Sequence, residues 1–497
     1  MFVTLAVLGW LWGSPAPSYW GTLRPGPHPV GFTQLWVTDS TRRLPGGSKF
    51  GLTHRPVLLN IWYPARPARA AAMPYDDYFQ GAIRVARAPG LRRYASELMA
   101  YQRATAWREL ARAERDSTEP TLARRIEALF RNPAYARRDL PRAELNGNII
   151  VYTSGAGSSM DDNVVLCEYY ASLGFTVVGS AFPEEDNTTF NTNGSDRSRP
   201  RDIARMLMEL PRQGFPVSHV TAIGHSAGAQ ALLWATADPS LPVDAVLSLD
   251  TTEDYSMLSD RSWSYFTDDL VRRRHDVKLP IMFVADREGL FELADSLVDS
   301  RRTLVTVPDL GHNDFISQGN ISRQLHAGLP DADSSGQVAA ETGYRALLEY
   351  ALAWMAAVRA GEEPPATASP LAMTVIPPGT RFPALGSDPV GSARELRHLY
   401  AVADAGEFAR RFGLARVADR HLASRSVLTM ILVDGIRRGA PARAREVYRL
   451  LLAQDSTLEE IPAFMESRAK LFQRIGATEI AAEWRSLRLA LIDATGD

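Results

Sequence analysis

The central part of the chain alternates between two kinds of apolar pattern. Short, continuous apolar runs rich in β-branched residues predict strands that are buried on both faces. Between them lie segments whose apolar positions recur at helical spacing. This alternation predicts an α/β core with a doubly wound, mostly parallel sheet. The predicted strands are 146–154, 175–180, 219–225, 243–250, 279–286 and 303–309, and the predicted helices are 161–174, 199–213 and 227–237.

The pattern changes before this core and at its end. Two β-rich runs, 30–43 and 56–65, are separated by Pro, Gly and Ser and predict an antiparallel opening to the sheet. Residues 75–142 have helical spacing and arginine-rich polar positions, which predicts a helical insertion before the first parallel strand. We expect the α/β domain to span residues 21–360.

A second domain follows a change in composition. Residues 361–391 are rich in Pro, with Ala, Ser, Thr and Gly, and are typical of a linker. Residues 392–497 have a helical pattern throughout. Two segments there, which begin at Gly439 and Gly476, resemble each other and suggest stacked helical hairpins of tetratricopeptide-like type. This all-helical domain is a possible binding module for a protein partner.

The chain begins with an apolar segment, MFVTLAVLGWLWGSPAPS. It is too short to span a bilayer and resembles the apolar region of a secretory signal peptide, with a cut near Ala16, so residues 1–20 are interpreted as a possible signal peptide. We therefore expect a periplasmic or secreted protein. The alternatives are a buried N-terminal segment or a misassigned start, with the protein in the cytoplasm. No later run reaches membrane-spanning length, and we expect no integral membrane span.

Composition excludes several classes of function. The chain has 497 residues, of which 45% are hydrophobic and 23% are charged, as in ordinary globular proteins of two or three domains. A formal net charge of -2 gives no reason to expect nucleic acid as a partner. The only cysteine is Cys167, so no intramolecular disulfide can form and cysteine-based zinc sites are excluded. We expect neither a metal nor a cofactor.

The stretch GHSAG, Gly224 to Gly228, is the one match in the chain to the pattern G-x-S-x-G. A strand-like run precedes it and a helix-like run follows it, as in a nucleophile elbow. A sharp strand-to-helix turn strains the backbone of the serine, and small flanking residues make the turn possible. Ser226 is therefore the candidate nucleophile, and its neighbour His225 is interpreted as a packing residue.

A serine hydroxyl needs a base to take its proton, and imidazole has a suitable pKa. His312 lies on a polar, glycine-containing loop after the last predicted strand, where catalytic bases of open α/β sheets lie. It is the candidate base. The other histidines after Ser226 fit less well and are His275, His326, His398 and His421.

The acid that orients the histidine should come from another strand end. Asp250 ends the run 243–250, and Asp286 and Glu288 follow the next strand along the chain. The residues favour Asp250 because a polar loop follows it, and both later carboxylates remain alternatives.

An oxyanion intermediate also needs backbone N–H donors. One donor should come from Ala227, directly after the nucleophile. The other should come from the loop that follows strand 146–154, where the run Ser154-Gly155-Ala156-Gly157 allows the backbone to approach a ligand closely.

These motifs occur in an order that resembles a known family. The opening runs, the loop YTSGAGSS, the elbow GHSAG, the strand end LSLD and the loop LGHNDF are similar to those of bacterial α/β-hydrolases of the platelet-activating factor acetylhydrolase and dienelactone hydrolase type. The resemblance covers about residues 26–358 and not the helical tail. It implies cleavage of carboxylic esters without a cofactor. It also implies the roles of nucleophile for Ser226, base for His312 and acid for Asp250, with Ala156 and Ala227 in the oxyanion hole.

The sequence thus predicts a serine hydrolase that acts on a small-molecule or lipid ester. Two other enzyme classes stay open, a serine peptidase of prolyl-oligopeptidase type and a hydrolase of lipid or polyester. An inactive hydrolase fold that serves as a binding scaffold is the alternative outside enzymes.

Overall fold

The computed structural model describes most of the chain, in two compact units. One unit contains Met1–Asp250, Lys278–Met282 and Val307–Thr374, and the other contains Thr251–Val277, Phe283–Thr306 and Val375–Asp497. The predicted signal peptide, except its last residues, and part of the expected linker lie outside the described residues. The residues that the structure describes are 17–111, 120–183, 198–238, 241–250, 270, 272–286, 289–329, 336–366, 373–376, 388–420, 422–474 and 478–492.

The sheet is mixed and mostly parallel, as the apolar pattern predicted. Strand β1 (Val30–Arg43) pairs antiparallel with β2 (His54–Pro64), which pairs antiparallel with β5 (Thr176–Gly179). Strand β4 (Asn148–Thr153) lies parallel to both β5 and β6 (His219–His225). The other strands are β3 (Arg137–Arg138), β7 (Ala245–Leu249), β8 (Ile281–Ala285), β9 (Arg302–Thr306) and β10 (Thr374–Ile376), in the order β10-β9-β8-β7-β6-β4-β5-β2-β1-β3.

The register of the central strands brings three chain segments to one edge of the sheet. Thr153 at the end of β4 lies opposite Gly224 of β6, and His225 lies opposite Leu249 at the end of β7. All residues of β7 and nearly all of β4 and β6 are buried, as expected for parallel strands covered on both faces. The segments that follow β4, β6 and β7 therefore start side by side at the carboxyl edge of the sheet.

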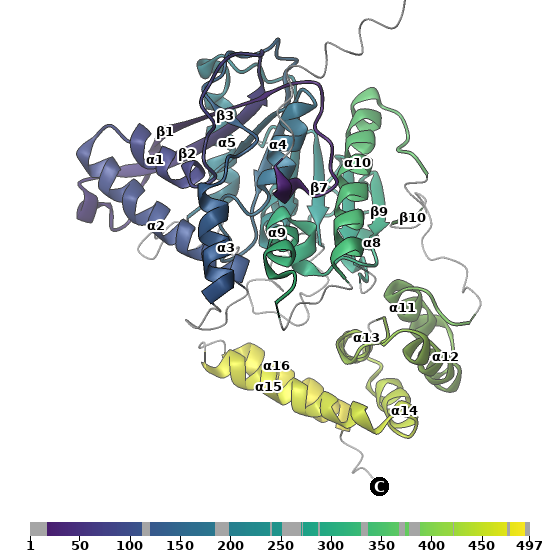
Figure 1. The fold of residues 1–497 in the computed structure, drawn as a ribbon. Helices are drawn as coiled ribbons and strands as arrows, with labels where there is room; N and C mark the ends of the chain where they lie inside the picture. Colours follow the sequence, from purple (N-terminus) through teal and green to yellow (C-terminus); the bar gives the residue numbers. More distant parts are fainter. Residues whose placement is uncertain are drawn as a thin grey trace, which may run out of the picture. The chain divides into compact units, whose positions relative to one another are not determined.

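The first unit carries helices on both sides of the sheet (Figure 1). Helix α4 is buried at every position, whereas α1, α3 and α5 each have one buried and one exposed face. The helices of this unit are α1 (Asp77–Val85), α2 (Pro89–Ala111), α3 (Pro120–Arg131), α4 (Val164–Ser172), α5 (Ser198–Glu209), α6 (Ala227–Ala235), α9 (Ser317–His326) and α10 (Gln337–Ala360).

Helices α1, α2 and α3 form the stretch that the sequence predicts as an insertion. Trp36 of β1 donates its ring N–H to the carbonyl of Ala82 in α1 at 2.8 Å. Ser322 of α9 donates its hydroxyl to the carbonyl of Leu110 in α2 at 2.9 Å. The insertion is thus attached both to the antiparallel edge of the sheet and to α9.

The second unit has a separate apolar core, formed largely by helices after residue 392. Leu290 is part of this core, and Asp295 pairs with Arg394 at 2.7 Å and Arg397 at 3.5 Å. Among the described residues, no helix is long and apolar enough to cross a bilayer. The helices of this unit are α8 (Glu292–Ser296), α11 (Ala393–Val402), α12 (Ala405–Ala418), α13 (Arg425–Arg437), α14 (Pro441–Leu452), α15 (Glu460–Arg474) and α16 (Thr478–Ile492).

A buried carboxylate on α4 joins distant parts of the first unit. Glu168 is fully buried and accepts hydrogen bonds from the Tyr78 hydroxyl at 2.7 Å, the Trp20 ring N–H at 2.9 Å, the Ala136 N–H at 2.9 Å and the Tyr19 hydroxyl at 3.0 Å. Burial raises the pKa of Glu168, and the hydrogen bonds oppose this shift. One side chain therefore fastens the N-terminal segment, α1 and the end of the insertion to the core.

We predict that Glu168→Leu strongly destabilises the protein, because it leaves several buried donors without an acceptor. Each such donor is worth about 1–3 kcal/mol in the free energy of unfolding. Glu168→Gln should lose less, since its amide oxygen still accepts. Urea denaturation followed by tryptophan fluorescence measures both, with Glu349→Leu on the exposed face of α10 as the control. Equal stability of the Glu168→Leu variant and the wild type would contradict the prediction.

Candidate active site

Ser226 forms the sharp turn between β6 and α6. Its backbone angles are φ 54° and ψ -124°, a conformation that costs a non-glycine residue about 1–3 kcal/mol. Its N–H donates to the carbonyl of Leu249 at 3.1 Å, and its carbonyl accepts from the N–H of Gln230 at 3.2 Å. The side chain does not cap α6. The hydrogen bonds of the Ser226 N–H and carbonyl thus hold the strained turn, and the Ser226 hydroxyl makes no capping bond to α6.

The two glycines of the motif are required by close packing. A Cβ atom on Gly224 would lie 2.5 Å from the backbone nitrogen of Ala229. A Cβ atom on Gly228 would lie 2.4 Å from the carbonyl oxygen of Thr153 and 2.5 Å from that of Ser154. Any side chain at these two positions would therefore push α6 away from the sheet edge, in agreement with the expected need for small residues.

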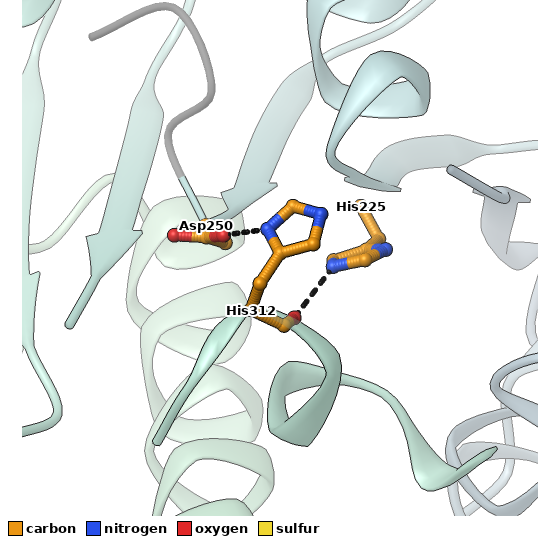
Figure 2. Close-up of side chains that lie close together, drawn as sticks. All are labelled: His225, Asp250 and His312. Carbon is orange, nitrogen blue, oxygen red and sulfur yellow. Dashed lines mark hydrogen bonds and ion pairs between the residues drawn. The ribbon is translucent and has the colours of Figure 1, made fainter. Parts of the chain in front are cut away.

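His312 and Asp250 form a pair at the same edge of the sheet. Asp250 directly follows β7 with a left-handed φ of 53°, and His312 begins the short 3₁₀ helix His312–Phe315 after β9. The His312 Nδ1 contacts the Asp250 Oδ2, as Figure 2 shows. The Asp250 side chain is only 3% exposed, whereas that of His312 is 44% exposed. Because a carboxylate accepts, Nδ1 donates, and Nε2 is the basic nitrogen of the neutral ring.

The alternative acids are placed differently. Asp286 is half-buried at the end of β8, and Glu288 lies outside the described residues. Of the carboxylates proposed from the sequence, Asp250 is the one whose contact with His312 is found in the described part of the chain. Among the described residues, no hydrogen bond joins the Ser226 hydroxyl to His312. Catalytic hydrogen bonds are often long without substrate and shorten when it binds.

His225 is a buried support for the histidine turn. Its Nε2 donates to the carbonyl oxygen of His312 at 2.9 Å (Figure 2). The centroids of the two imidazole rings lie 4.7 Å apart. Burial and the charge of protonated His312 lower the pKa of His225 to about 3. His225 is therefore neutral at ordinary pH, and the packing role predicted from the sequence includes a hydrogen bond to the His312 backbone.

The loop after β4 lies against the serine. A Cβ atom on Gly155 would lie 3.1 Å from the His225 Nδ1 and 3.3 Å from the Ser226 Cβ. Ala156 is exposed, and Ala227 is buried at the first position of α6. Each candidate oxyanion residue is thus the chain neighbour of a residue at this contact: Ala156 follows Gly155, and Ala227 follows Ser226.

Two buried charged residues beside this loop were not singled out from the sequence. Asp162 accepts from the Tyr152 hydroxyl at 2.7 Å, the Ser158 hydroxyl at 2.9 Å and the Gly155 N–H at 3.4 Å. Burial raises its pKa to about 7. Arg199, at the start of α5, donates to the carbonyl of Ser154 at 2.5 Å. The signal that could have found Asp162 is a pair of aspartates between a glycine-rich loop and an apolar helix.

Among the residues that the structure describes, His225, Asp250 and His312 form the group that could hold a metal ion, since one ligand atom of each lies within 4.8 Å of the others. One ring nitrogen of each histidine is engaged within the protein. The His312 Nδ1 contacts Asp250, and the His225 Nε2 donates to a backbone carbonyl. A metal ion that bound through these two nitrogens would have to displace both bonds.

Comparisons with known proteins find distant likenesses to solved structures. No protein-family model matches the chain, and no curated protein matches it. Among solved structures, a ferulic acid esterase from Streptomyces cinnamoneus is 16% identical with a TM-score of 0.42 and covers 70% of this chain and 96% of its own. A dienelactone hydrolase from Anabaena variabilis is 20% identical with a TM-score of 0.26, and the match covers 40% of this chain and 86% of the hydrolase. At these scores the likenesses carry no argument about the reaction.

The low pKa of His225 predicts an acid-sensitive loss of stability. Below the ordinary histidine pKa of about 6.5, His225 binds a proton in the unfolded chain but not in the folded protein. The free energy of unfolding therefore falls as the pH drops from 6.5 towards 3. At pH 5.5 this group should account for about 1.4 kcal/mol of lost free energy of unfolding.

His225→Gln can still donate to the His312 carbonyl but does not titrate, so it should lose less stability than the wild type on acidification. Urea denaturation at pH 7.5 and pH 5.5 measures the difference. The control Ser96→Ala, on the surface of α2, removes no titratable group and should lose as much as the wild type. An equal loss in His225→Gln and the wild type would show that His225 is protonated in the folded state.

Proposed function

We propose that the protein is a serine hydrolase of the α/β-hydrolase type that cleaves carboxylic esters through an acyl-enzyme. The observation that carries this proposal is Ser226 in a strained strand-to-helix turn, at the sheet edge where the Asp250–His312 pair also lies. A strained backbone at a serine is maintained at a stability cost, and a nucleophile held at a sheet edge is the common reason. The motifs that resemble platelet-activating factor acetylhydrolases and dienelactone hydrolases support the same reaction.

In the first half of the reaction, the Ser226 Oγ attacks the carbonyl carbon of the ester while the His312 Nε2 accepts the hydroxyl proton. Asp250 holds Nδ1–H and stabilises the resulting imidazolium. The N–H groups of Ala156 and Ala227 stabilise the negative oxygen of the tetrahedral intermediate. The intermediate collapses as the carbon–oxygen bond to the alcohol breaks, and the alcohol leaves with the proton from His312.

In the second half, water attacks the acyl-enzyme and gives a proton to His312. The second tetrahedral intermediate releases the carboxylic acid, and the proton returns to the Ser226 Oγ. His225 remains neutral throughout because of its low pKa, so its Nε2–H keeps its hydrogen bond to the His312 carbonyl.

We predict that Ser226→Ala abolishes hydrolysis of 4-nitrophenyl butyrate and labelling by a fluorophosphonate, because only the nucleophilic hydroxyl is removed. Its melting temperature should stay at or above that of the wild type. The control Ser96→Ala, on the surface of α2, should retain activity and labelling. Labelling of the Ser226→Ala variant at the wild-type level would exclude Ser226 as the nucleophile.

We further predict that Asp250→Asn lowers kcat by roughly 10⁴-fold, because an amide at this position favours the wrong tautomer of His312. Asp286→Asn and Glu288→Gln should lose less than about tenfold, as neither carries the orienting role. The three purified variants are compared on 4-nitrophenyl butyrate. Near-normal turnover of Asp250→Asn, with a large loss in one of the other two, would move the acid to the end of β8.

A further inference from the structure

The first peptide of the loop after β4 is held between a guanidinium group and a carboxyl group. The carbonyl of Ser154 accepts a hydrogen bond from the Arg199 Nη1 at 2.5 Å. The N–H of the same peptide, which belongs to Gly155, donates to the Asp162 Oδ2 at 3.4 Å. In a trans peptide the carbonyl and the N–H point in opposite directions. Arg199 and Asp162 therefore bind this peptide from opposite sides and fix its orientation.

The next peptide is oriented by the same arginine. The carbonyl of Gly155 accepts from the Arg199 Nη2 at 3.4 Å. Its N–H belongs to Ala156 and must point away from the guanidinium. Gly155 itself lies against the serine, since a Cβ on it would be 3.3 Å from the Ser226 Cβ. The hydrogen bonds of Arg199 thus select one of the two directions that the Ala156 N–H can take beside the nucleophile.

Both ionisable groups are suited to hold the loop rigidly. Arg199 is 1% exposed and Asp162 is 0% exposed, and buried charges are stable only with well-placed partners. The planar guanidinium presents parallel N–H donors in a fixed fork, which matches two successive carbonyls better than a lysine ammonium does. Asp162 is in turn fixed by the hydroxyls of Tyr152 and Ser158.

We propose that Arg199 is a positioning residue of the hydrolase: by binding the Ser154 and Gly155 carbonyls, opposite Asp162, it turns the Ala156 N–H towards the oxyanion that forms at Ser226. Arg199 does not touch the substrate. Its effect is on the stabilisation of the tetrahedral intermediate and not on ground-state binding. This inference rests on the proposed function, because it assigns a direction to one donor of the proposed oxyanion hole.

The test compares full-length wild type, Arg199→Lys and the control Arg201→Lys, which changes an exposed arginine two residues further along α5. Arg199→Lys keeps the charge but loses the fork. Its kcat on 4-nitrophenyl butyrate should fall roughly 10- to 100-fold, while KM stays within about twofold. The inhibition constant of butylboronic acid, whose serine adduct is tetrahedral, should rise by the factor by which kcat/KM falls. Arg201→Lys should match the wild type in all three.

Asp162→Asn is the second variant, which answers the question if Arg199→Lys does not fold. Its amide oxygen still accepts from Tyr152 or Ser158, but its NH₂ group cannot accept the Gly155 N–H. We expect the same pattern of reduced kcat, unchanged KM and weaker boronic acid binding. Folded variants that keep kcat and boronic acid affinity within about twofold of the wild type, or that lose activity through KM alone, would overturn the inference.

Failure of the proposed function would look different. In that case the wild type itself would neither hydrolyse the ester nor be labelled at Ser226 by a fluorophosphonate, and the inference would fall with it. A wild type that is active and labelled, together with active variants at positions 199 and 162, would overturn the inference about Arg199 and leave the proposed function standing.

Discussion

The first turn of α6 approaches the end of β4 so closely that no methyl group fits between them. A Cβ on Gly228 would lie 2.4 Å from the Thr153 carbonyl oxygen. This contact sets the position of Ser226 relative to the loop that begins at Ser154, because the helix and the strand cannot separate without losing the packing of both. The strained φ of 54° at Ser226 follows from it, since the chain must reverse direction within one residue to enter α6 at this distance.

Buried charges orient the groups around this contact. Asp250, Asp162 and Arg199 are each almost fully buried, and each is bonded to a different part of the site. The backbone carbonyl of Asp162 also accepts from the Gln318 N–H at 2.8 Å, a few residues after His312. Asp162 therefore connects the loop that carries Ala156 with the segment that carries the histidine. A buried charge tolerates few alternative partners, which limits the conformations of both segments.

The helical insertion belongs to the same arrangement. Gln102 of α2 accepts a hydrogen bond at 2.7 Å from the N–H of Met160, which lies just after the loop of Ala156. The carbonyl of Leu110, also in α2, accepts a hydrogen bond from Ser322 in α9. The insertion thus contacts the segments on either side of the site within the first unit. Its arginines are largely used in pairs and carbonyl contacts, as in the bond from Arg103 to Asp76 at 2.7 Å and the bond from Arg125 to the Leu325 carbonyl at 2.6 Å.

The sequence by itself determined the alternation of strands and helices, because apolar periodicity records which faces are buried. It also determined the turn at Ser226, because only Gly224 and Gly228 allow such close packing. Local pattern left Asp250, Asp286 and Glu288 open as partners of His312, since all three lie at strand ends. The tertiary structure brought Asp250 to His312 through the order of the strands in the sheet. It alone decided the place of Arg199, because a contact between residues as far apart in the chain as Arg199 and Ser154 leaves no periodic trace in the sequence.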